Sequence, residues 1–375
     1  MRTKAIIHLD RFLANIEEVR KRVGIDRRVC LPIKANAYGH GALEIANASL
    51  EAGVYCFGVA TVAEGTELRK GGIKAPILLF SQPHPSEIPE IIETGLSPFV
   101  SDTWFVDALN AQAATKSIKL PVHVKIDTGM GRIGCSAEEA AALARRVTAC
   151  PGLALDGIAT HFAVADSADG GDRAYTKSQL SLFKEAVDAV KNAGVEAGIV
   201  HAANSGAVIL HPDAWLDMVR PGILLYGYKA VEENQIPGFP YEPLQVKPVM
   251  ELITTVALIK KVKKGDSVSY GRIWKAPRDT NIAVLPIGYA DGFPRLASGK
   301  WKAVIDGKTY PQAGVICMDH CCLDIGPEHN VKRWDEAVIF GGAAESAAAL
   351  ARTIGTIPYE ITCGISGRVP REYHR

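Results

Sequence analysis

The stretch RVCLPIKANAYGHG, residues 28–41, joins a short apolar run to a polar segment that contains Lys34 and two glycines. A short apolar run bounded by turn residues is typical of a buried strand. The segment GALEIANASLEAG at 41–53 follows, with the character of a helix. A strand followed by a helix is the repeating unit of a parallel sheet. This stretch therefore predicts the start of a series of β-α units.

The same pattern continues to about residue 227, with further helix-like segments at 137–150 and 173–194. Eight strands alternating with helices close a (β/α)₈ barrel of roughly 200 to 250 residues. We therefore predict an α/β fold with an N-terminal (β/α)₈, TIM-type barrel. The eight apolar runs are RVCLPIK (28–34), FGVAT (57–61), ILLFS (77–81), PFVSD (98–102), VHVKID (122–127), LDGIATHF (155–162), IVHAANS (199–205) and MVRPGILLYG (218–227).

A doubly wound open sheet is the competing architecture. Such a sheet normally places a glycine-rich phosphate turn after its first strand. No GxGxxG pattern follows residue 34 in this sequence. The barrel is therefore favoured.

After about residue 235 the sequence no longer alternates between short apolar runs and helix-like segments. The Pro/Gly-rich segment IPGFPYEP (236–243) predicts a boundary, and helical character returns only around 343–355. We predict a barrel domain over 11–235 and a mainly β domain over 236–375, with residues 1–10 pairing into the latter. The alternating segments are VMELITTVALIKKV (249–262), TNIAVLPIGYADG (280–292) and WKAVIDGKTYPQAGVICMDHCCLDIG (301–326).

Composition narrows the range of partners. The chain has 375 residues, 42 Lys+Arg and 41 Asp+Glu, so its formal net charge is +1. This balance gives no electrostatic reason to expect a nucleic acid or an anionic membrane as partner. No window is apolar for the length of a membrane span. Because Asp10 and Arg11 interrupt the N-terminal apolar residues, we expect no signal peptide and a cytoplasmic location.

The cysteines do not predict a metal site. There are eight, and no pair has CxxC spacing. The cluster CMDHCC at 317–322 includes His320, but neighbouring Cys321 and Cys322 would point to opposite faces of a strand. We expect reduced thiols and no metal.

Unusual polar residues stand where several predicted barrel strands end, which is where the chemistry of such barrels collects. Each has an ordinary structural explanation: a lysine can extend to the rim, a histidine can be satisfied in the core, and a serine can cap a helix. Their placement at one mouth is harder to explain structurally. They are Lys34, Asp127, Arg132, His161, Asn204, Ser205 and Arg220.

Two of these segments predict a phosphate site. Ser205-Gly206 stands at the end of the seventh predicted strand, and Pro221-Gly222-Ile223 lies within the eighth apolar run. The loops after strands seven and eight are the usual phosphate-binding site of these barrels. A phosphate seat opposite Lys34 suits pyridoxal phosphate bound as an imine. An aldolase that forms an imine with a phosphorylated substrate is the rival at this point.

PIKANAYGHG (32–41) resembles the pyridoxal-lysine signature of alanine racemases, and the resemblance covers nearly the whole chain. Eight further blocks stand in the family's order, with VRPGILLYG (219–227) among them, which makes a chance match implausible. The blocks are KIDTGMGRIG (125–134), THFAVAD (160–166), HAANSGA (201–207), VRPGILLYG, VSYGR (268–272), IGYADGFPR (287–295), CMD (317–319) and YEITCGISGRVPR (359–371).

The resemblance implies a head-to-tail homodimer with shared active sites that interconverts L- and D-alanine and supplies D-alanine for peptidoglycan. Lys34 and the partner's Tyr270 would be the two catalytic residues, on opposite faces of pyridoxal 5'-phosphate. The cofactor-binding residues would be Lys34, Tyr38, His161, Ser205, Arg220, Gly222, Ile223 and Tyr359. Arg132, Met318 and Tyr289 would bind or admit the substrate, and Lys125 occupies a position that is carbamylated in some relatives.

One residue departs from the family pattern, because many relatives have arginine where this chain has Val315. This departure affects a basic contact near the entry and none of the residues named above. Alternative functions are a serine or broader-specificity racemase, a pyridoxal phosphate binding protein without catalysis, and a decarboxylase. The last would need an acidic partner for the pyridine nitrogen, where the resemblance places Arg220.

Overall fold

The structure is a computed structural model that describes residues 3–231 and 241–375. The chain divides into two compact units. The barrel unit comprises Leu13–Ala37 and Ala42–Val246, and the β unit comprises Met1–Phe12, Tyr38–Gly41 and Lys247–Arg375. The predicted domain boundary between residues 235 and 236 falls outside the described residues.

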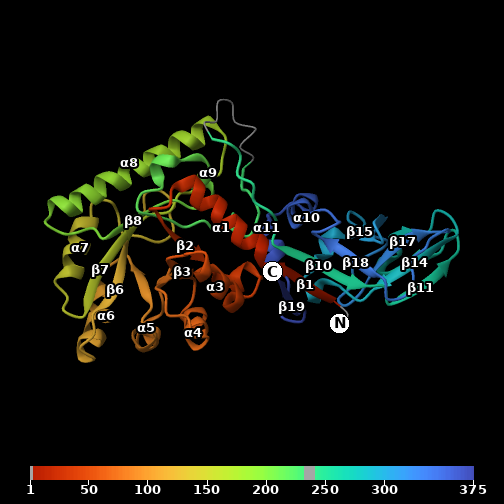
Figure 1. The fold of residues 1–375 in the computed structure, drawn as a ribbon, viewed down its shortest axis with the longest axis horizontal. Helices are drawn as coiled ribbons and strands as arrows, with labels where there is room; N and C mark the ends of the chain where they lie inside the picture. Colours follow the sequence, from red (N-terminus) through yellow and green to blue (C-terminus); the bar gives the residue numbers. More distant parts are fainter. Residues whose placement is uncertain (1–2, 232–240) are drawn as a thin grey trace. The chain divides into compact units, whose positions relative to one another are not determined.

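The barrel unit contains eight parallel strands in the order β8-β7-β6-β5-β4-β3-β2-β9. Figure 1 labels β2, β3, β6, β7 and β8 of this sheet. β8 and β9 complete the ring through backbone bonds from Asp217 N–H to Val200 O (3.1 Å) and from Arg220 N–H to Ala203 O (2.8 Å). The predicted (β/α)₈ architecture is therefore confirmed. The strands are β2 (Arg28–Pro32), β3 (Cys56–Val59), β4 (Ile77–Leu79), β5 (Ser97–Val100), β6 (Leu120–Lys125), β7 (Leu153–Ala159), β8 (Ile199–His201) and β9 (Met218–Val219).

Helices separate these strands along the chain, and several of them are capped by a side chain at the first turn. Thr61 and Glu64 form a capping box at α4, and Asp102 and Asp169 accept backbone N–H groups at α6 and α8. The helices predicted at 41–53, 137–150 and 173–194 correspond to α3, α7 and α8. The helices are α1 (Leu9–Val23), α2 (Lys34–Tyr38), α3 (Ala42–Glu51), α4 (Val62–Lys70), η1 (Pro85–Glu87), α5 (Ile88–Thr94), α6 (Thr103–Thr115), α7 (Ala140–Thr148), α8 (Gly170–Asn192), α9 (Ser205–Leu210) and η2 (Pro212–Ala214).

The β unit is built on a six-stranded sheet in the order β16-β15-β18-β10-β1-β19, with sheets of three (β11-β14-β17) and two (β12-β13) strands. Residues 3–8 form β1, which pairs antiparallel with β10 and parallel with β19. The strands are β1 (Thr3–His8), β10 (Met250–Thr255), β11 (Leu258–Val262), β12 (Ser267–Val268), β13 (Trp274–Lys275), β14 (Thr280–Leu285), β15 (Lys302–Ile305), β16 (Lys308–Pro311), β17 (Cys321–Gly326), β18 (Glu336–Phe340) and β19 (Arg371–His374).

Short helices complete the β unit. The segment predicted as helical at 343–355 contains α10 (Ala347–Ile354), and α11 (Pro358–Cys363) follows it. The sequence analysis did not predict α11, because a helix of one or two turns has too few residues to show periodicity. Single-turn helices also occur at η4 (Tyr270–Arg272), η5 (Tyr289–Asp291) and η6 (Arg295–Ala297).

No helix within residues 3–231 and 241–375 combines the length and apolar character that crossing a membrane requires. All eight cysteines are free thiols. Cys321 is buried and Cys322 is partly exposed on β17, in agreement with the predicted alternation.

Candidate active site

Lys34 lies at the carboxyl end of β2 and opens a single turn of left-handed helix. Ala35, Asn36 and Ala37 have φ values of 52°, 52° and 55°, and Tyr38 has a φ of 53°. For residues other than glycine this conformation costs roughly 1–2 kcal/mol each. Such strain persists only where neighbouring groups hold it and is concentrated at functional sites.

Glu64 is one of the groups that hold this turn. Its Oε1 accepts a hydrogen bond from Ala35 N–H (2.7 Å), while its Oε2 accepts from Ala60 N–H (2.8 Å) and Thr61 N–H (3.3 Å). Asn36 Oδ1 accepts from Ala42 N–H (2.8 Å) at the other side of the turn. Glu64 therefore connects the start of α4 to the residue that follows Lys34.

Replacing Glu64 with alanine is expected to lower the free energy of unfolding by about 1–2 kcal/mol, because several backbone N–H groups and a helix cap lose their acceptor. Urea unfolding measures the effect. Glu67→Ala, an exposed position on the same helix, is the control, and equal effects of both variants would contradict this role of Glu64.

Arg220 is buried just after β9, with 5% of its surface exposed. Its Nη2 donates to Thr160 O (2.7 Å) and Ala202 O (3.0 Å) and lies 3.4 Å from His161 Nδ1. Its Nη1 lies 2.8 Å from His201 Nδ1. Burial lowers the pKa of Arg220 to about 10, so the guanidinium remains charged at neutral pH.

His161 and Lys125 lie in the field of this arginine. Burial, followed by the charges of Arg220, Lys125 and other cations, holds the pKa of His161 well below its usual range. Burial and Arg220 also lower the pKa of Lys125 to about 7, although Asp127 opposes this. Lys125 Nζ donates to Ile126 O (3.0 Å). Both groups are therefore largely uncharged just above neutral pH.

Arg132 lies on the loop after β6, and Asp127 shapes this loop. Asp127 Oδ1 accepts from the N–H groups of Gly129, Met130 and Gly131 (2.9–3.1 Å), and Oδ2 accepts from Arg132 N–H (3.1 Å). Partial burial would raise the pKa of Asp127, but these backbone bonds outweigh it and the pKa is lowered. The loop leaves Arg132 exposed.

The loops that carry Ser205 and Gly222 meet in the barrel unit. Ser205 Oγ accepts a hydrogen bond from Leu224 N–H (3.3 Å), and Asn204 caps α9 by accepting from Ala207 N–H (3.0 Å). Ile223 is fully buried. The two segments predicted as a phosphate seat are thus side by side.

In the β unit, Tyr38 lies beside Tyr359, with ring centroids 5.7 Å apart. Gly39 makes their approach possible, since a Cβ at this residue would lie 2.0 Å from Thr362 O. Arg371 Nε donates to Gly39 O (3.0 Å). The β unit therefore holds two of the predicted phosphate ligands together.

Tyr270, Met318 and Tyr289 form another group in the β unit. Tyr270 is 72% exposed and Met318 is 52% exposed, and both line a depression of about 540 Å³. Tyr289 N–H donates to Cys317 O (3.0 Å) and Ala290 N–H donates to Met318 O (3.0 Å). Val315, where relatives often have arginine, is buried and accepts a hydrogen bond from Ser269 Oγ (2.7 Å).

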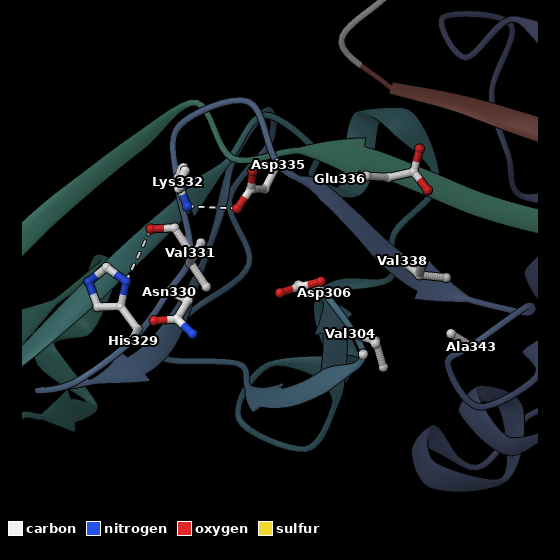
Figure 2. Close-up of a pocket in the computed structure, with 11 residues that line it drawn as sticks. Val304, Asp306, His329, Asn330, Val331, Lys332, Asp335, Glu336, Val338 and Ala343 are labelled. Carbon is white, nitrogen blue, oxygen red and sulfur yellow. Dashed lines mark hydrogen bonds between the residues drawn. The ribbon is translucent and has the colours of Figure 1, made fainter.

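A larger hollow of about 960 Å³ in the β unit contains none of the predicted site residues. Figure 2 shows Asp306, Asp335 and Glu336 around it, with Lys332 hydrogen-bonded to Asp335. Its lining also includes the apolar residues Val304, Val331, Val338 and Ala343, and it contains no candidate catalytic residue. The hollow therefore does not compete as the active site.

The predicted residues thus fall into groups that each lie within one unit. The barrel unit holds Lys34, Lys125, Arg132, His161, Ser205, Arg220, Gly222 and Ile223, and the β unit holds Tyr38, Tyr359, Tyr270, Tyr289 and Met318. His161 was predicted, but Glu64, His201 beside Arg220, and His123 beside His201 were not predicted from the sequence. The TVAE capping-box pattern at 61–64 could have drawn attention to Glu64, whereas nothing in the local sequence singled out His123.

The chain matches known proteins over most of its length. Residues 7–230 match the family model described as alanine racemase, N-terminal domain, and residues 249–373 match alanine racemase, C-terminal domain. The alanine racemase of Treponema denticola is 48% identical over 98% of this chain and 97% of its own.

Solved structures are similar over the whole chain. The alanine racemase of Clostridium difficile 630 superposes with a TM-score of 0.93 at 35% identity, covering 100% of this chain and 96% of its own. That of D-cycloserine-producing Streptomyces lavendulae gives 0.92 at 36% identity, covering 100% and 97%. The chain therefore belongs to the alanine racemase family.

Proposed function

We propose that this protein interconverts L-alanine and D-alanine with pyridoxal 5'-phosphate, supplying D-alanine for peptidoglycan. The observation that carries the proposal is the buried Arg220, held beside His161 at the end of the barrel strands, in a chain where Lys34 follows the first barrel strand, Arg28–Pro32. A serine or broader-specificity racemase would share these groups, but the relatives compared above are named alanine racemases.

The residues present fit the proposed cofactor. A phosphorylated pyridine aldehyde needs an amine, a phosphate seat and a partner for its ring nitrogen. Lys34 offers the amine, and Arg220 is a buried cation among carbonyls and neutral imidazoles with no carboxylate bonded to it in residues 3–231 and 241–375. Tyr38, Ser205, Tyr359 and the backbone of Gly222 and Ile223 would bind the phosphate.

When bound, pyridoxal phosphate supplies an electron-withdrawing ring that stabilises negative charge at the substrate Cα. Arg220 can only donate hydrogen bonds, so beside the ring nitrogen it would keep a proton off that atom. This would limit how far negative charge spreads and would favour rapid return of a proton to Cα. His161, with its lowered pKa, adds no further positive charge beside Arg220.

Inversion at Cα requires a proton to leave one face and another to arrive at the opposite face. Lys34 would carry the proton on one face, and Tyr270 of a second copy would carry it on the other. A tyrosine with an ordinary pKa near 10 needs nearby positive charge to act as a base, and Arg132 would supply part of it. Arg132 and the Met318 backbone would bind the substrate carboxylate, and Tyr289 would narrow the entrance.

A homodimer is part of this proposal. The high exposure of Tyr270 and Met318 supports it, since a catalytic phenol in open water would not have a fixed position. Ile273 and Leu296, each 67% exposed in the same unit, offer apolar surface for a second copy. Eight free thiols suit the reducing conditions of the cytoplasm, where we place the enzyme.

The test is incubation of the purified protein and pyridoxal phosphate with each L-amino acid in deuterated water. Deuterium uptake at Cα together with formation of D-alanine is the expected result. Rapid conversion of serine or larger amino acids would favour the broader-specificity alternative. Deuterium exchange without any inversion would overturn the proposed racemisation.

Lys125 is expected to react with carbon dioxide to form a carbamate, releasing one proton. Its amine is largely unprotonated above about pH 7, and an anionic carbamate would offset the charges of Arg220 and Arg132 that depress its pKa. With ¹³C-bicarbonate at pH 8, one carbamate signal should appear, and it should decline as the pH falls below 7. Lys125→Ala should lack the signal and lose about tenfold in activity, whereas a signal that persists in this variant would assign the carbamate to another lysine.

A further inference from the structure

A continuous chain of hydrogen bonds crosses the barrel interior and ends on Arg220. Arg220 Nη1 lies 2.8 Å from His201 Nδ1, and His201 Nε2 lies 2.9 Å from His123 Nδ1. His123 Nε2 lies 3.3 Å from Asp156 Oδ2. The two imidazoles are buried, whereas 44% of the Asp156 side chain is exposed. The chain therefore links a carboxylate in contact with solvent to a buried arginine of the proposed active site.

The two ends of this chain impose the same direction on it. A guanidinium can only donate hydrogen bonds, so His201 must present the lone pair of Nδ1 and carry its proton on Nε2. His123 then accepts at Nδ1 and donates from Nε2. An ionised carboxylate can only accept hydrogen bonds, so Asp156 accepts the bond that His123 donates from Nε2. Both histidines are thus neutral, in agreement with the lowered pKa of His201, which follows from burial and the charge of Arg220.

The backbone makes room for this chain. Val122 pairs with Leu155 and His123 pairs with Gly157, so Asp156 is the extra residue of a β-bulge in β7. A bulge changes the direction of a side chain. At Gly157 a Cβ would lie 2.4 Å from His123 Nδ1, so any larger residue would displace the imidazole. Phe99 packs against both imidazoles, with centroid distances of 6.1 and 6.0 Å.

Arg220 also needs a counter-charge. Its partners in the described part of the chain are Thr160 O, Ala202 O and two neutral imidazoles. A buried charge without an ionic partner is costly. A carboxylate that accepts a hydrogen bond from one imidazole polarises the hydrogen-bonded imidazoles, so that the nitrogen facing Arg220 becomes a stronger acceptor. Arg28 is a second cation near Asp156, so the carboxylate could instead serve only a local pair.

We propose that Asp156 is a positioning residue for Arg220, and that it orients and charge-balances the guanidinium through His123 and His201. The effect of Asp156 on catalysis rests on the proposed function, whereas the chain of hydrogen bonds from Asp156 to Arg220 does not. In the complete enzyme, Asp156 would act at the end of the barrel interior remote from Arg220 without touching substrate or cofactor.

The test compares the full-length protein with Asp156→Asn, labelled with ¹⁵N-histidine, by long-range ¹H–¹⁵N spectra. Both buried histidines of the unmodified protein should be neutral with the proton on Nε2. In Asp156→Asn, the resonances of His123 and of His201 Nδ1 should both shift, because removing the charge depolarises the whole chain. A shift confined to His123, or a proton on Nδ1 of either ring, would overturn the proposal.

The kinetic readout uses the holoenzyme and two further variants. Asp156→Asn and His123→Gln should each lower kcat about tenfold while KM changes by less than about twofold. Glu196→Gln, an exposed carboxylate just before β8, is the matched control and should change neither the spectrum nor kcat. An unchanged kcat in Asp156→Asn would overturn the positioning role. If the parent protein does not racemise alanine, the spectra still decide whether the hydrogen bonds connect Asp156 to Arg220 through the two histidines.

Discussion

Replacing Lys34 with alanine is expected to reduce racemisation by more than about 10³-fold, because in the proposed mechanism one change removes both the covalent link to the cofactor and a proton carrier. The strained turn after Lys34 supports this expectation. Four successive residues with φ between 52° and 55° are held in place by Glu64 and Asn36. A structural lysine at a strand end would not need such a turn.

Reduction with borohydride provides an independent readout. In the parent protein, pyridoxal phosphate should become fixed to the peptide that contains Lys34, and mass spectrometry should locate it there. Lys34→Arg keeps a positive charge near His161 but cannot form the link, so it should be as inactive as Lys34→Ala. Lys74→Ala, an exposed position, is the control. Activity within roughly tenfold of the parent in Lys34→Ala, or label on another lysine, would refute the assignment.

The barrel was predictable from the sequence because short apolar runs mark its strands and longer amphipathic segments mark its helices. Each strand is a short apolar run, and the polar residues that follow β2, β6 and β8 stand at the ends that meet at one mouth. Roles such as those of Tyr270 and Met318 came from the family resemblance alone. Their exposure in the structure is compatible with a site shared between two copies, but periodicity gave no sign of it.

The left-handed turn was not predictable, because Ala35 and Ala37 have strong right-handed helix propensity. The turn is hydrogen-bonded to Glu64, whose carboxylate comes from the next β-α unit. The chain of hydrogen bonds from Asp156 to Arg220 was not predictable from the sequence for a related reason. It requires a bulge between β6 and β7 and the missing side chain of Gly157, and both depend on strand register. Hydrophobic pattern fixes strands more firmly than it fixes register details of this kind.

Replacing Tyr270 with phenylalanine is expected to lower the racemisation rate by about 10²- to 10⁴-fold, the usual contribution of a positioned acid–base group. Because Lys34 remains, one enantiomer of alanine should still exchange its Cα hydrogen with deuterated water without inversion. Tyr310→Phe removes a phenol from β16 of the same unit and should leave the rate unchanged. Exchange of both enantiomers at parental rates in Tyr270→Phe would show that this phenol carries no proton.

Mixing the two inactive variants tests whether Tyr270 acts across the dimer. If Lys34 of one copy works with Tyr270 of the other, a heterodimer of Lys34→Ala and Tyr270→Phe chains contains one intact site and one doubly altered site. Random reassociation makes half of the dimers mixed, so about a quarter of the parental activity should return. If both residues act within one chain, every site carries a substitution and no activity returns. The mixture therefore separates a shared site from a self-contained one, whatever the absolute rate of either variant.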